Sequence, residues 1–65
     1  MTAATLYRYD VWMHLAGNSA TRSWLGTYRR LGNAKVAADR KVGPGVVTYV
    51  TDRQTGERLY EGRER

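Results

Sequence analysis

The side chains that could carry covalent chemistry are few and scattered. His14 is the only histidine and the chain has no cysteine, so a zinc site built from these ligands is excluded. Ser19 and Ser23 have no histidine at a spacing typical of a catalytic base. Three glutamates crowd the chain end, where carboxylates are usually solvated charges: Glu57, Glu61 and Glu64. The sequence therefore predicts a protein that is not an enzyme and uses no metal or cofactor.

The glycine-rich segment Gly43-Pro44-Gly45 does not have the spacing of a phosphate-binding loop. It lacks the GxGxxG and GxxxxGK patterns, and it follows a predicted helix, whereas phosphate loops precede one. Glycine tolerates the left-handed position after a helix and proline cannot continue one. We therefore interpret the segment as a helix terminator.

Charge is the strongest signal in the composition. Eleven Lys and Arg face six Asp and Glu, for a net charge of +5 over 65 residues. This excess predicts either a positive field directed at a partner or simply solubility combined with codon bias. Arg-rich, Ile-free usage is typical of GC-rich genomes and suggests an actinobacterial or phage origin. Without a signal peptide or an apolar run near the roughly 20 residues of a membrane span, we expect a cytoplasmic protein with no membrane partner.

Aromatic and arginine side chains alternate along a predicted first hairpin. Residues 6–16 have the period of a half-buried strand, 17–19 give a turn, and 22–31 form the second strand. The face of the first strand that carries Val11 is expected to pack on a helix. The opposite face of the hairpin collects side chains that pair with phosphates or guanine edges and stack on bases. The candidate binding residues are Arg8, Trp12, Arg22, Trp24, Tyr28 and Arg30.

Two of these candidates have an alternative placement. A thin core needs its large side chains, and a one-residue error in register moves a strand residue to the other face. Trp24 and Tyr28 therefore remain open between surface and core.

The rest of the chain predicts a helix and a second hairpin. Asn33 is a plausible N-cap, and the helix after it presents Ala34, Ala37, Ala38 and Val42 on one face. Residues 46–51 and 58–61 are predicted strands, joined by a loop in which Gly56 takes a positive φ. The expected fold class is α+β: a small, mostly antiparallel four-stranded sheet in the order ββαββ, with one short helix on one face. Residues 1–65 form one domain, with 1–5 a loose leader and 62–65 a fraying tail.

Residues 23–40, SWLGTYRRLGNAKVAADR, resemble the last strand and helix of the plant ethylene-response-factor DNA-binding domain. The matching pattern is a WLGT(F/Y) strand followed by an alanine-rich helix with Asp-Arg near its end. The resemblance implies that Trp24 and Arg22 face DNA and that Ala34 and Ala37 are packing residues. The arginine-rich first strand of that family is not visible here, and its fold has no C-terminal hairpin. Arm-binding domains of tyrosine integrases share the plan more loosely, and the full-length layout resembles short bacterial and phage proteins.

The sequence thus favours a small DNA-binding module that uses the outer face of the first hairpin. The main alternative is a protein-interaction module, such as a phage-encoded modulator of a host protein, that uses the same aromatic and arginine face. Trp, Tyr and Arg also dominate protein interfaces, so composition does not separate the two. A third alternative is a homodimer formed by edge pairing of the last strand.

Overall fold

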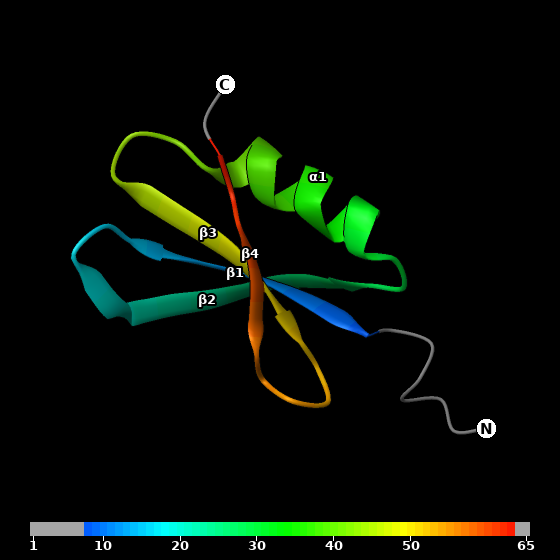
Figure 1. Cartoon of the computed structure of the whole chain (residues 1–65). Coiled ribbons are helices and arrows are strands. Elements are labelled where there is room, and N and C mark those ends of the chain that lie inside the picture. The colour runs from blue at the N-terminus through cyan, green and yellow to red at the C-terminus, as the bar shows by residue number, and fades with distance from the viewer. Residues whose placement is uncertain (1–7, 64–65) are drawn as a thin grey trace.

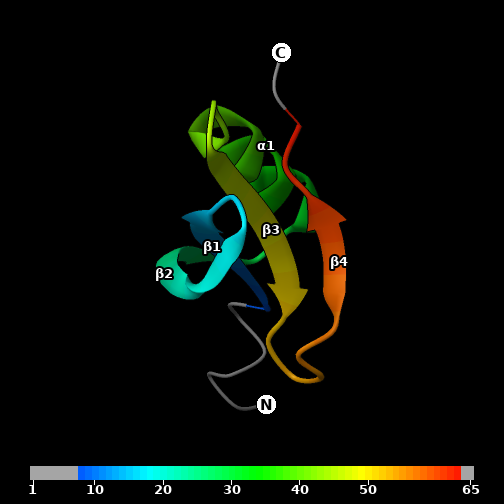
Figure 2. The ribbon, with the colours of Figure 1, turned by 90° about the vertical axis from the view of Figure 1, so that its left-hand side faces the viewer.

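Five elements follow one another in residues 8–63, the part of the chain that the computed structural model describes. They are β1 (Tyr9–Leu15), β2 (Asn18–Tyr28), α1 (Leu31–Lys41), β3 (Val46–Asp52) and β4 (Arg58–Glu61). Every strand pairs antiparallel with its neighbour, in the sheet order β2-β1-β3-β4 (Figure 2). The helix lies across one face of this twisted sheet (Figure 1). The expected α+β fold with ββαββ order is confirmed; the leader at 1–5 and residues 64–65 lie outside the described part.

The alternation of β1 decides which side chains meet the helix. Val11 is fully buried and lies opposite Val50 of β3, while the neighbouring residues Asp10 and Trp12 point to the other face. Successive side chains of a strand point to opposite faces of the sheet, with a period of two residues. Because β1 is hydrogen-bonded on both sides, it supplies the centre of the sheet and of the core. No helix in residues 8–63 has the length and apolar character needed to cross a membrane.

Alanines let the helix approach the sheet closely. Ala34 and Ala38 are fully buried and pack against Val11 and Val50, as the alanine pattern predicts. Ala37 is partly buried on the same side. Small side chains on this face leave little volume between helix and sheet, so larger residues would overpack it.

Both ends of the helix differ in detail from the prediction. Arg30 is the N-cap residue, with an extended backbone and no capping side-chain bond, so the prediction of Asn33 as N-cap is wrong. The helix starts earlier because Leu31 packs against the core. At the other end Val42, which was predicted to share the helical face, leaves the helix in an extended conformation, and Gly45 takes a positive φ of 75°. The glycine-proline-glycine segment ends the helix by this turn.

The C-terminal strand is tied to the helix by polar contacts. The Tyr60 hydroxyl and the Arg63 amide both donate to Asp39 Oδ1, at 2.8 and 2.9 Å, and the former bond raises the pKa of Tyr60. The Gly62 amide donates to the Thr48 carbonyl at 2.8 Å. Gly62 and Arg63 are therefore hydrogen-bonded to β3 and α1, and the fraying of the tail at 62–65 stays a prediction.

Gly62 occupies a point of very close approach. The buried Thr48 hydroxyl donates to the Ala38 carbonyl at 2.8 Å, which joins β3 to α1. A Cβ on Gly62 would collide with that hydroxyl and would lie 2.9 Å from the Ala38 carbonyl oxygen. A glycine is required here because β4 leaves the sheet directly over this bond.

The loop after β3 is organised by Asp52. Its carboxylate accepts the Gln54 amide at 2.8 Å and the Thr55 amide at 3.3 Å, and lies 3.6 Å from the Arg8 guanidinium. The pKa of Asp52 is lowered, mainly by the hydrogen bond from the Gln54 amide and further by the Thr55 amide and the Arg8 charge. Burial opposes this shift without reversing it. Gly56 has φ 75°, as predicted for this turn, and its amide donates to the Asp52 carbonyl.

We predict that Gly62→Ala lowers the free energy of unfolding by about 1–3 kcal/mol, because the new methyl group displaces the Thr48 hydroxyl from Ala38. The matched control is Gly32→Ala in α1, where a Cβ meets nothing within 4 Å and should stabilise the helix by about 0.5–1 kcal/mol. Urea unfolding of the three proteins measures both effects. Equal stabilities of the two variants would contradict the close approach at Gly62.

We predict a specific acid dependence for Asp52→Asn. Because the folded pKa of Asp52 is lowered, its carboxylate stabilises the fold fully above its usual value of 3.8 and loses this effect as pH falls through the folded pKa. Asparagine keeps an oxygen acceptor for the Gln54 amide and loses the charge. Unfolding free energies should show the wild type more stable than the variant at neutral pH, with the gap closing below about pH 4. A gap that stays constant down to about pH 2 would argue against this role for the charge.

Candidate functional site

The face of the sheet opposite α1, here called the outer face, carries three aromatic rings in one row. Trp24 of β2 and Tyr49 of β3 are the cross-strand partners of Trp12 in β1. We call these three residues the aromatic band. Directly opposite positions on one face of a sheet have Cβ atoms about 4.5–5.5 Å apart, so the three side chains lie side by side across three strands.

Hydrogen bonds fix both indole rings. The Trp12 Nε1–H donates to Thr51 Oγ1 at 3.0 Å, and the Trp24 Nε1–H donates to Asp10 Oδ1 at 3.2 Å. Asp10 is buried although it lies on the outer face. Its carboxylate is therefore an internal acceptor for the indole rather than an exposed negative charge. Each ring has its polar edge satisfied by the sheet and its orientation fixed before any ligand arrives.

Two arginines stack on the band. The Arg22 guanidinium carbon lies 4.7 Å from the centre of the Trp12 ring, and that of Arg58 lies 4.0 Å from the centre of the Tyr49 ring. Cation–π contact of this kind orients the planar guanidinium while its N–H edge remains able to donate. The outer face thus carries two oriented cations, one on each side of the band.

His14 belongs to the same face. Its ring lies 5.9 Å from the Tyr49 ring, tilted by 55°, and its Nδ1 lies 2.8 Å from the carbonyl oxygen of Leu15. At that separation Nδ1 carries the proton and donates, which leaves Nε2 as the acceptor of the neutral ring. His14 therefore extends the band with a ring that can both stack and accept.

Exposure differs strongly within the band. Tyr49 is only 5% exposed beneath Arg58, whereas Trp24 is 55% exposed. A fixed ring that is half open to solvent can stack on a planar group at little cost in side-chain entropy. Trp24 is accordingly the member of the band that is most accessible to a ligand.

The structure brings three of the six predicted residues together: Trp12, Arg22 and Trp24. Tyr28 was expected on the outer face but packs against the core on the helix side. The cause is a β-bulge: Trp24 lies opposite Trp12 and Gly26 opposite Val11, which leaves Leu25 without a partner and reverses the alternation after it. Of the two placements left open by the sequence, Trp24 is on the surface and Tyr28 is in the core.

The remaining two candidates lie away from the band. Arg8 precedes β1 at the end of the sheet, where its guanidinium contacts Asp52. Arg30 is exposed in the link between β2 and α1, at the N-cap of the helix. Neither of them contributes to the row of rings, so the site is narrower than the sequence alone predicts.

Besides His14, two members of the site were not among the candidates, namely Tyr49 and Arg58. Both come from the second hairpin, and they join the first because β3 pairs with β1 rather than with β2. Sequence alternation places Tyr49 on one face of its strand but does not give the strand order. Arg58 begins the last predicted strand, but no sequence pattern places its side chain over the Tyr49 ring.

Comparisons with known proteins add no relative: no family model matches the chain, and no curated protein or solved structure matches it either. Residues 8–63 contain no group of three or more His, Asp or Glu side chains placed to hold a metal ion. The geometry of the outer face is consequently the basis for a functional proposal.

We predict that the hydrogen bonds of the two indole N–H groups can be removed independently of each other. Asp10→Ala should raise the hydrogen-exchange rate of the Trp24 indole N–H roughly fivefold, the factor for a bond contributing about 1 kcal/mol, and leave Trp12 unchanged. Thr51→Val should do the reverse. Nitrogen-15 NMR resolves the two indole signals. If neither substitution changes its own indole, the rings are not held by these acceptors.

Proposed function

We propose that this domain binds nucleic acid, most directly DNA, without catalysis, through the outer face of the sheet. The observation that carries the proposal is the aromatic band with a guanidinium stacked on each side of it. Aromatic faces stack on bases, and arginines donate to phosphates or to guanine edges. A nucleic acid offers both partners together, since its bases can stack on the rings and its phosphates can accept hydrogen bonds from the arginines.

The roles of the residues follow from their exposure. Trp24 offers the open ring for stacking on a base or packing against a sugar. Arg22 and Arg58, already oriented by Trp12 and Tyr49, donate to backbone phosphates. Because the guanidinium groups are held before binding, less side-chain entropy is lost on complex formation. The net charge of +5 adds a general attraction to a polyanion.

DNA is favoured as the ligand by the resemblance of residues 23–40 to the ethylene-response-factor domain, where a strand tryptophan and neighbouring arginines contact DNA. Trp24 and Arg22 hold the matching positions and both lie on the outer face. Ala34, which the resemblance assigns to packing, is buried. A two-stranded ribbon of the size of β1 and β2 also suits the major groove.

The same face would serve a protein-interaction module, for which Trp24 would be the central anchor. The two functions differ in their response to salt. Phosphate contacts release condensed counterions, so affinity for DNA falls with a log–log slope of about −0.9 per phosphate neutralised. In a protein complex, salt acts mainly on the association rate.

We predict that Arg22→Ala and Arg58→Ala each make the salt slope of DNA binding less steep by about 0.9. Trp24→Ala should weaken binding by about 1–3 kcal/mol with the slope nearly unchanged, since stacking releases no counterions. The matched control is Lys41→Ala on α1, away from the outer face, which should leave both quantities near those of the wild type. Fluorescence anisotropy with a mixed-sequence duplex and with oligo(dT), each over a salt series, measures them.

Absence of binding to either probe at low ionic strength, where nonspecific affinity is strongest, would contradict the proposal. An equal effect of Lys41→Ala and Arg22→Ala would place the contact elsewhere on the molecule. In either case the aromatic band would become a candidate protein interface.

A further inference from the structure

A second surface lies on the other face of the sheet, where α1 runs beside the edge strand β2. A cavity of about 270 Å³ opens between the two elements. It is smaller than the roughly 300–1,000 Å³ of a typical small-molecule site, so it suits one inserted side chain better than a whole cofactor. The residues that line this α1–β2 groove are Leu25, Tyr28, Ala37, Arg40 and Lys41.

The floor of the groove is apolar because of the β-bulge. Leu25 has no partner in β1, and it packs together with Tyr28 and Ala37 against the core. Bulges re-aim side chains in this way. The irregularity that removes Tyr28 from the outer face therefore builds the floor of a groove on the helix side.

The backbone beside the groove is free to pair. β2 stands at one end of the sheet order, and within residues 8–63 no strand pairs with its outer edge. It is also the longest strand, with 11 residues. An exposed edge of this kind presents N–H and C=O groups that can bind an extended segment as an additional strand.

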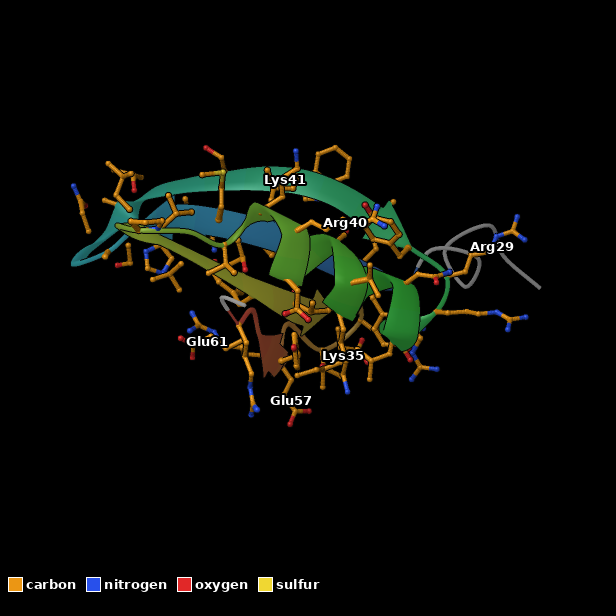
Figure 3. The ribbon with its side chains drawn as sticks, turned by 90° about the horizontal axis from the view of Figure 1, so that it is seen from above. Arg29, Lys35, Arg40, Lys41, Glu57 and Glu61 are labelled. Atoms are coloured by element: carbon orange, nitrogen blue, oxygen red, sulfur yellow. The ribbon has the colours of Figure 1, made fainter. Side chains whose placement is uncertain are left out.

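The rim of the groove is positive. Arg40 and Lys41 are both exposed, and Figure 3 shows them on the side of α1 that faces β2. On the other side of the helix, towards β4, the Lys35 ammonium lies 5.1 Å from the centre of the Tyr60 ring. The two cations on the β2 side favour a ligand that carries negative charge.

We propose that the α1–β2 groove binds an extended acidic segment of a partner protein. The segment adds to the edge of β2 as a strand and inserts one apolar side chain between Leu25, Tyr28 and Ala37. Its flanking carboxylates then meet Arg40 and Lys41. The main-chain bonds supply affinity and the inserted side chain supplies selectivity, as in other cases of strand addition. This site uses neither the aromatic band nor its arginines, so peptide binding in the groove can be tested independently of DNA binding.

The test is fluorescence anisotropy of the whole chain with a labelled peptide that has one leucine within a glutamate-threonine sequence. The expected result is saturable binding that Lys41→Glu weakens by about tenfold, because a rim cation becomes a like charge. The matched control is Lys35→Glu, the same change on the opposite side of the same helix, which should alter affinity by less than about twofold. Thermal unfolding of both variants confirms that each remains folded.

Three altered peptides complete the design. Replacing the glutamates by lysine, the leucine by serine, or alternate backbone amides by N-methyl groups should each abolish most of the binding. The proposal is overturned if the original peptide does not bind, if the lysine peptide binds equally well, or if Lys41→Glu and Lys35→Glu have the same effect. A concentration-dependent dimer that pairs through β2 in sedimentation and NMR measurements would also overturn it, since a second copy would then cover the groove.

Discussion

The packing of two alanines of α1 against two valines of the sheet is the contact on which the rest of the structure depends. Ala34 and Ala38 are fully buried against Val11 and Val50, which belong to the two central strands. Thr48 reinforces this contact with a buried hydrogen bond to the Ala38 carbonyl. A domain of this size has little stability to spare, so this short interface has a large influence on the whole fold.

The placement of the helix on one face leaves the other face of the sheet for aromatic side chains. On the outer face Arg22 lies over the Trp12 ring and Arg58 over the Tyr49 ring, and the polar edges of the indoles bond to Asp10 and Thr51. The band therefore has two effects at once. It shields the central strands, and it keeps Trp24 open and fixed for a ligand. A stabilising layer and a binding surface are made from the same residues.

Local patterns predicted the elements and the packing face, because strand alternation and alanine spacing are properties of neighbouring residues. The strand range 58–61, the buried Ala34 and Ala38, and the positive φ of Gly56 followed from such patterns. The placement of Tyr28 did not, because a single bulge at Leu25 reverses the alternation without a sequence signal. Tyr49 and Arg58 were missed because strand order depends on contacts between distant segments.

The role of the outer face as the ligand surface is tested most directly by NMR of the nitrogen-15-labelled chain titrated with duplex DNA at low ionic strength. If the outer face binds DNA, the indole N–H signals of Trp24 and Trp12 shift together with the amides of β1 and the first half of β2. Signals of α1 around Ala37 should remain in place. Shifts confined to α1, with both indole signals unchanged, would contradict it.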